Sequence, residues 1–122
     1  MDNRLNIINK KLEELSHSKF RSSFHLNSKM LSYLDQKGYL IIKEHAHEFV
    51  LKNLAPAYPK NDGHQTPMKN HPVFIAQHAC ACCCRNCLFK WYHIDKGKYL
   101  SDNEVDLIVM VLISWIKREI NK

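Results

Sequence analysis

The sequence predicts a mainly α-helical fold: a single compact domain of about five helices with one long Pro-rich loop and a Cys/His cluster. Apolar residues recur at helical spacing in several separate segments. The four prolines, in contrast, all fall within residues 55–72. The chain has 122 residues, of which 45% are hydrophobic and 25% charged. These values are typical of one soluble globular domain, which we assign to residues 1–122.

The first predicted helix covers residues 4–15. Its apolar positions share one face: Leu5, Ile8, Leu12 and Leu15. Residues 20–27 are predicted to form a connection that carries two aromatic side chains. A short helix then begins after Asn27 or Ser28, both good capping residues, and ends at Gly38.

A longer helix is predicted from Tyr39 to Leu54. The residues expected to face inward are Ile41, Ile42, His45, Ala46, Phe49 and Val50. His45 lies one turn from both Ile41 and Phe49, so we interpret it first as a core histidine with a hydrogen-bonded ring. A metal-ligating or catalytic role for His45 is the alternative.

Residues 55–72 read as a loop, because prolines and the Asn61-Asp62-Gly63 turn exclude a regular helix. A connection of this length is unusual in a compact domain and tends to be functional. Pro72 suits the first turn of a new helix, which would run to His78. Residues 88–92 are predicted to form a further short helix.

The last helix has the clearest start signal in the chain. Ser101 and Glu104 have the spacing of a capping box, with Leu100 and Val105 positioned as a hydrophobic staple. The helix that follows is apolar on more than one side, which predicts that it is central to the core. The residues expected to be buried are Val105, Ile108, Val109, Leu112, Trp115, Ile116 and Ile120.

Charge and hydropathy indicate where in the cell the protein is expected and which kinds of partner it could bind. The N-terminal residues lack the apolar core of a signal peptide, and no apolar run reaches the ~20 residues of a membrane-spanning helix. We therefore expect a cytoplasmic protein without membrane association. The net charge of +6 is compatible with a nucleic-acid or protein partner, but the lysines are spread along the chain, which favours an ordinary solvated surface. The pattern predicts no oligomeric state.

The chemistry of the chain is concentrated between His71 and His93. All five cysteines lie between Cys80 and Cys87, and thiolates and imidazoles are the ligands that zinc prefers. Cys84 and Cys87 form a C-x₂-C pair, and a closed zinc site needs two more ligands. The candidates at short range are His71, His78, Cys80, Cys82 and Cys83.

Other interpretations of the cysteines remain open. An iron–sulfur cluster is the less favoured cofactor. Buried inert thiols and thiol-redox chemistry are the two metal-free alternatives. A c-type haem is excluded because Leu88, not histidine, follows Cys87.

Three segments together resemble a family of small bacterial proteins filed only as a domain of unknown function. They read NDGHQTPM (residues 61–68), HPVFIAQHA (71–79) and CCRNCLFKW (83–91). The similarity extends over nearly the whole chain and implies a shared fold, but it carries no established activity.

The resemblance also narrows the set of metal ligands. Typical members keep His45, His71, His78, Cys83, Cys84 and Cys87. They carry threonine at positions 80 and 82, so Cys80 and Cys82 become weaker candidates. The family also tends to have histidine where this chain has Tyr92, next to His93. The resulting predicted metal ligands are His78, Cys83, Cys84, Cys87 and His71.

Two functional hypotheses follow. In the first, a zinc ion makes the chain a structural or binding module and fastens the 55–72 loop to the helices. In the second, the metal keeps an open position for water near that loop, as in a hydrolase. His71 or His45 would then act as a base, and Asp62, Gln65 and Thr66 would orient a substrate.

Overall fold

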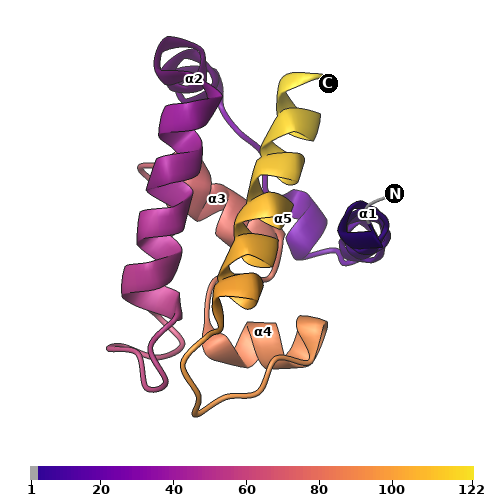
Figure 1. Cartoon of the computed structure of the whole chain (residues 1–122). Helices are drawn as coiled ribbons and strands as arrows, with labels where there is room; N and C mark the ends of the chain where they lie inside the picture. Colours follow the sequence, from indigo (N-terminus) through magenta and orange to yellow (C-terminus); the bar gives the residue numbers. More distant parts are fainter. Residues whose placement is uncertain (1–2) are drawn as a thin grey trace.

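The computed structural model describes residues 3–122, which form helices and loops without a strand (Figure 1). This confirms the predicted mainly α-helical class. The elements are α1 (Asn3–Ser16), the short 3₁₀ turn η1 (Arg21–Ser23), α2 (Ser28–Phe49), the π-helical turn η2 (Val50–Leu54), α3 (Pro72–Ala79), α4 (Arg85–Tyr92) and α5 (Asp102–Ile120).

The centre of the fold is α5, as its two-sided apolar pattern predicts. It packs against α1, α2, α3 and η2 (Figure 1). The side chains that it buries are mostly branched aliphatic: Val105, Ile108, Val109, Val111, Leu112 and Ile116. Its first turn carries the expected capping box, in which Ser101 Oγ accepts from the Glu104 N–H at 3.1 Å and Glu104 Oε1 accepts from the Ser101 N–H at 2.9 Å.

The two helices predicted on either side of Gly38 are present as two arms of α2. Gly38 has φ 80° and ψ 165°, a conformation that favours glycine and interrupts the helical backbone. The arm before it begins at Asn27, whose side chain accepts from the Met30 N–H at 2.8 Å. The chain therefore bends at Gly38, and the second arm runs beside α5 (Figure 1).

Three residues expected on buried faces are exposed instead. Leu5 is 52% exposed, Ile41 is 39% exposed and Ile120 is 42% exposed. All three fit the helical period of their own segment, but the neighbouring helices do not extend over them. Helix α4 also begins earlier than residue 88, because Cys84 caps it and Arg85 forms its first turn.

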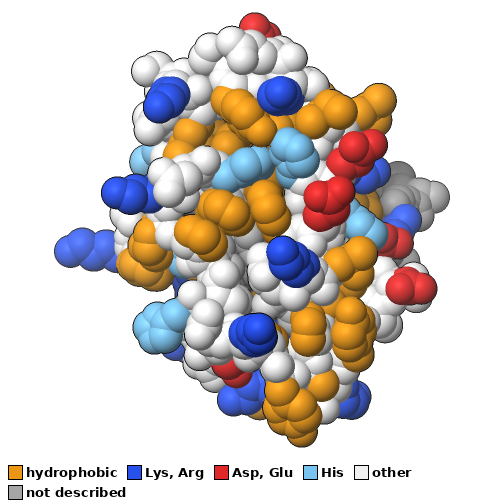
Figure 2. All heavy atoms as spheres, turned by 90° about the vertical axis from the view of Figure 1, so that its left-hand side faces the viewer, with side chains coloured by type: hydrophobic (Ala, Val, Ile, Leu, Met, Phe, Trp, Pro, Cys, Tyr) orange, Lys and Arg blue, Asp and Glu red, His pale blue; other side chains and the backbone are white. Residues whose placement is uncertain are grey.

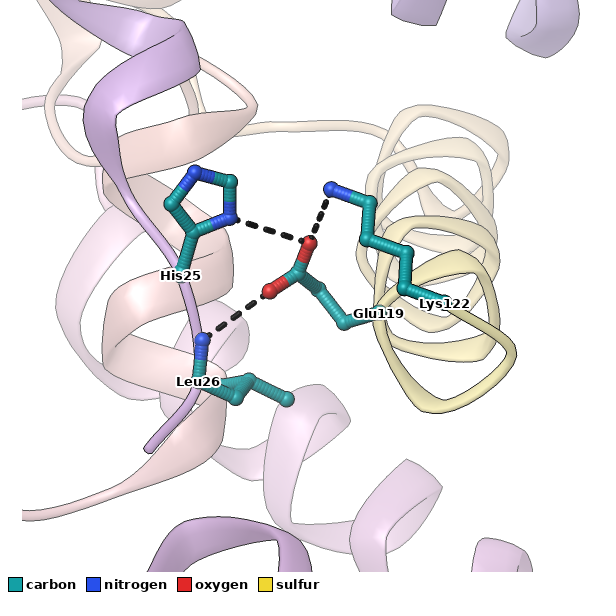
Figure 3. A network of polar contacts seen from close by, with 4 residues as sticks. All are labelled: His25, Leu26, Glu119 and Lys122. Atoms are coloured by element: carbon teal, nitrogen blue, oxygen red, sulfur yellow. Dashed lines mark hydrogen bonds and ion pairs between the residues drawn. The ribbon is translucent and has the colours of Figure 1, made fainter. Parts of the chain in front are cut away.

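The end of α5 is joined to the segment before α2 by a buried carboxylate. Glu119 accepts hydrogen bonds from the backbone N–H of Leu26 at 3.0 Å and from Lys122 at 2.6 Å, and it lies 3.3 Å from His25 Nδ1 (Figure 3). Burial opposes ionisation of Glu119, but these hydrogen bonds outweigh it and keep the carboxyl pKa below 4.5. The carboxylate therefore fixes the packing of α5 against residues 25–26.

On the face in Figure 2, lysine and arginine side chains are scattered among apolar ones and do not form a continuous patch. No helix within residues 3–122 combines the length and the apolar character needed to cross a membrane.

Candidate metal centre

Three cysteines are brought together at the start of α4. Cys84 is the N-cap residue of this helix, and its backbone is extended (φ −155°, ψ 167°). Its sulfur accepts a hydrogen bond from the Cys87 N–H at 3.4 Å, the contact that an N-cap side chain makes with the third helical residue. The C-x₂-C spacing thus turns both thiols toward the same point, and Cys83 joins them from the preceding residue.

The three sulfur atoms have the separation that one metal ion requires. Cys87 Sγ lies 3.3 Å from Cys84 Sγ and 3.6 Å from Cys83 Sγ, and all three are within 4.8 Å of one another. With Zn–S bonds of about 2.3 Å at tetrahedral angles, zinc-bound sulfurs are about 3.8 Å apart. The donors are soft thiols, which suit zinc and other thiophilic metals. The residues present therefore fit a metal ion.

Arg21 is a fourth member of this cluster that sequence spacing did not indicate. Its guanidinium donates to Cys87 Sγ at 3.1 Å, to Cys83 Sγ at 3.6 Å and to the His78 carbonyl oxygen at 2.7 Å. Arg21 precedes these cysteines by more than sixty residues, so only the packing of η1 against α3 brings it there. Its positive charge stabilises thiolates at this site.

The thiols differ in acidity. The hydrogen bond that Cys83 shares with Cys87, reinforced by Arg21, lowers the pKa of Cys83 to about 7. The same bond and burial raise the pKa of Cys87 above its ordinary value. Without metal, Cys83 is therefore the thiol of the cluster that ionises most readily near neutral pH.

The Pro-rich loop is fastened beside the cluster by hydrogen bonds. The Thr66 hydroxyl donates to the Cys83 carbonyl oxygen at 2.7 Å. His78 Nε2 lies 3.1 Å from the Pro67 carbonyl oxygen and 3.2 Å from that of Thr66, so it donates to both. The ring of His78 also stacks on Phe24, with centroids 5.6 Å apart. These contacts occupy His78 Nε2 with the loop rather than with the cysteine sulfurs.

A second buried arginine holds the other end of the loop. Arg85, only 1% exposed, donates to the carbonyl oxygens of Ala55 and Pro56 and to those of Asp95 and Lys98. The last two bonds are 2.8 Å long and reach the segment between α4 and α5. Arg85 thus ties α4 to both flanking loops through backbone oxygens.

His71 lies in a different cluster. It caps α3, with Nδ1 accepting from the Val73 N–H at 3.0 Å, so its other nitrogen carries the proton and donates to His45 Nδ1 at 3.1 Å. Phe49, Phe74 and Tyr33 surround the pair. Burial, and then the proximity of His45, lower the pKa of His71 to about 4.

The other residues considered as metal ligands lie outside the group of three sulfurs. Cys80 and Cys82 are fully buried among core residues, and burial raises the pKa of each. The Tyr92 hydroxyl donates to the Cys80 carbonyl oxygen, so it has a structural role. His93 is exposed at the C-terminal end of α4, in a left-handed conformation with φ 58°.

The three loop residues proposed to orient a substrate do not point to one common site. Asp62 and Gln65 are partners of each other, and the Gln65 side chain also accepts from the Gly63 N–H. Of the three loop residues considered, Thr66 makes a hydrogen bond to the cysteine segment.

The fold and the site define a small helical domain with three cysteines that could hold a metal ion. Comparison with known families identifies the domain further: the family described as domain of unknown function DUF4186 matches residues 9–117, and the chain belongs to it. No solved structure matches the chain significantly.

Proposed function

We propose that this protein is a zinc-binding module in which the thiolates of Cys83, Cys84 and Cys87 hold one ion. The observation that carries the proposal is the convergence of their three sulfurs, 3.3 and 3.6 Å apart along two edges, at a partly exposed helix N-terminus. Three thiolates and Zn²⁺ carry one net negative charge, which the Arg21 guanidinium offsets.

The sulfur spacing favours zinc over an iron–sulfur cluster. In a [4Fe–4S] cluster each cysteine binds a different iron, so the sulfurs lie farther apart than around a single ion. A [2Fe–2S] cluster takes four cysteine ligands, and the two remaining thiols, Cys80 and Cys82, are buried in the core. A single zinc ion fits sulfurs at these short separations and does not require Cys80 or Cys82 as ligands.

The arrangement supports a binding role more than a purely structural one. All three thiols come from residues 83–87, so the metal would close only a very short loop and would contribute little chain entropy. Arg85, Thr66 and His78 already fasten the 55–72 loop without metal. We propose that the fourth zinc position accepts a ligand from outside the three cysteines. Neither ring nitrogen of His78 lies within 4.8 Å of all three sulfurs, so His78 could supply it only after its side chain moves.

Metal analysis of single variants tests the proposal. We expect about one zinc per chain in protein purified without chelator. Cys83→Ser, Cys84→Ser and Cys87→Ser should each weaken zinc binding at least ~100-fold, since loss of even an outer partner of a metal ligand costs 10–100-fold. Cys80→Ala and Cys82→Ala are the matched controls and should keep the metal. Wild-type protein that carries no more zinc than the Cys87→Ser variant would contradict the proposal.

A metal-free thiol-redox role is the second candidate. It is favoured by the sulfur–sulfur contacts and by the lowered pKa of Cys83, since a thiolate can attack the disulfide of an oxidised partner and the adjacent thiol can then displace that partner in its reduced form, which leaves a disulfide in this chain. Zinc binding and redox exchange predict opposite behaviour toward alkylation. Added zinc should protect Cys83 from iodoacetamide in the first case, and should leave its alkylation rate unchanged in the second.

A nucleic-acid or protein partner, with which the net charge is compatible, and the cytoplasmic location remain proposals. Binding through the basic surface would weaken as salt rises, because phosphate contacts release counterions. A gel-shift series over increasing salt concentration tests it, and salt-independent retardation would speak against phosphate contacts.

A further inference from the structure

The cysteine cluster contains three metal-ligating groups, one fewer than zinc needs. Among residues 3–122, no fourth His, Cys, Asp or Glu ligand atom lies within 4.8 Å of all three sulfurs. Zinc would have to complete its four-coordinate shell with an additional ligand. An ion that binds three thiolates and no more would be fully coordinated by Cys83, Cys84 and Cys87 alone.

Trivalent arsenic is such an ion, because its lone pair occupies the fourth direction and leaves a pyramid of three bonds. We propose that Cys83, Cys84 and Cys87 form a binding site for arsenic(III), taken up as arsenous acid. The inference uses the same three thiols as the proposed function but does not depend on zinc.

Two of the three sulfur separations fit this ion. Around arsenic(III) the S–As–S angles are narrower than tetrahedral, so the three sulfurs lie closer together than around zinc. The separations of Cys87 Sγ from the other two sulfurs, 3.3 Å and 3.6 Å, are both shorter than the spacing of about 3.8 Å expected for tetrahedral zinc. Thiolates are also the soft ligands that a thiophilic ion selects.

The binding reaction is an exchange without oxidation or reduction. Each thiol forms one As–S bond and displaces one hydroxyl of arsenous acid, which leaves as water with the thiol proton. Three thiols therefore release three waters, and arsenic stays trivalent. The Arg21 N–H groups that point at the sulfurs of Cys83 and Cys87 favour the thiolates that attack.

Solvent exposure and proximity distinguish Cys83, Cys84 and Cys87 from the other two cysteines. Cys87 is partly exposed and adjoins the other two sulfurs, which gives the small neutral acid access to the cluster. Cys80 and Cys82 have no exposed surface and belong to the hydrophobic core. Arsenic should therefore bind once per chain, even though five thiols are present.

Wild-type protein tests the proposal without any substitution. Reduced, metal-free chain is mixed with sodium arsenite and followed by native mass spectrometry and arsenic X-ray absorption. We expect one arsenic per chain with the loss of three hydrogens, and an arsenic shell of three sulfurs with no oxygen. Arsenic bonded to two sulfurs and an oxygen, or several arsenic atoms per chain, would overturn the proposal.

Variants and competition locate the site. Replacing any one of the three cysteines by serine turns a three-point attachment into a two-point one and should weaken binding on the order of 100-fold. Cys80→Ala and Cys82→Ala should bind like wild type, and loss of binding in either would count against the assignment. Circular dichroism confirms that each variant is folded before its affinity is compared.

Titration of the zinc-loaded protein with arsenite separates this inference from the proposed function. One-for-one displacement of zinc by arsenite supports both. A chain that binds arsenite through three sulfurs but never retains zinc refutes the zinc function and leaves the arsenic site standing. A chain that retains zinc on the three cysteines and binds no arsenite, loaded or metal-free, refutes the arsenic site alone.

Discussion

At the scale of single residues, Cys84 has two roles. Its sulfur accepts the Cys87 N–H at the start of α4 and also lies 3.3 Å from the Cys87 sulfur. A metal-bound thiolate is a stronger hydrogen-bond acceptor than a thiol, because it is charged. Metal binding and the capping of α4 should therefore stabilise each other, which couples metal affinity to the stability of the helix.

Two substitutions at Cys84 separate these roles. In the metal-free protein, Cys84→Ser keeps a capping oxygen and should leave the free energy of unfolding nearly unchanged, whereas Cys84→Ala should cost ~1 kcal/mol through loss of the cap. Both should abolish tight metal binding. Urea unfolding of the two metal-free variants measures the difference, and equal stabilities would show that the cap contributes nothing.

The His45–His71 pair predicts a pH dependence of stability. The pKa of His71 falls from 6.5 to about 4 on folding, so the folded state binds fewer protons than the unfolded state in this range. Its contribution to stability is complete above pH 6.5 and is lost as pH falls toward 4. His71→Asn keeps a capping acceptor and does not titrate.

Melting temperatures measured across this pH range test the assignment. The drop in Tm between pH 6.5 and 4 should be smaller in His71→Asn than in wild type. His64→Asn, a change at an exposed loop histidine, is the control and should follow wild type. The same slope in all three proteins would exclude His71 as the source.

At the scale of elements, Arg85 determines how α4 is placed. Its side chain connects the end of η2 and the beginning of the Pro-rich loop to the segment before α5, using backbone oxygens from both sides. One guanidinium can satisfy several carbonyls at once because its N–H groups point in fixed, divergent directions. The orientation of α4, and hence of the cysteines at its start, depends on this side chain.

Replacing Arg85 should destabilise the fold strongly. Arg85→Met leaves several buried carbonyl oxygens without a donor and should cost ~3 kcal/mol or more. Arg85→Lys should recover little of this loss, since one ammonium cannot reach both loops. Lys90→Met, on the exposed side of the same helix, is the control. Chemical denaturation measures all three, and a full rescue by lysine would contradict the geometric argument.

At the scale of the whole molecule, the N- and C-terminal parts are joined around α5. Glu119, one turn from the C-terminus of the chain, holds the backbone of Leu26 and the side chains of His25 and Lys122 (Figure 3). The segment it holds follows η1, which carries Arg21 to the cysteine sulfurs. Packing at the end of α5 is thereby linked to the geometry of the cysteine cluster.

Glu119→Gln should lower stability by about 1–3 kcal/mol, the usual cost of disrupting a buried charged hydrogen-bond network. Because the folded pKa of Glu119 lies below 4.5, its contribution is present above that pH and is lost as pH falls through the lower folded value. The stability difference between wild type and Glu119→Gln should therefore shrink in acid. A difference that stays constant from neutral pH to well below 4.5 would contradict this role.

The sequence alone determined the features that depend on neighbouring residues. Helical periods, the break at Gly38, the capping box at Ser101 and the Pro-rich loop all follow from local backbone preferences. The C-x₂-C spacing also predicted that Cys84 and Cys87 would converge, although the helix that Cys84 caps was expected to begin only at residue 88. The resemblance to the family is confirmed by the match of the family over residues 9–117.

Only the tertiary structure decided which distant groups meet. It placed Arg21 on the cysteine sulfurs, paired His71 with His45 and turned His78 toward the loop carbonyls. It also left Leu5 exposed although its helical period predicts burial. These outcomes depend on how the helices pack against one another, and residue spacing within one segment carries no information about the neighbours of that segment in space.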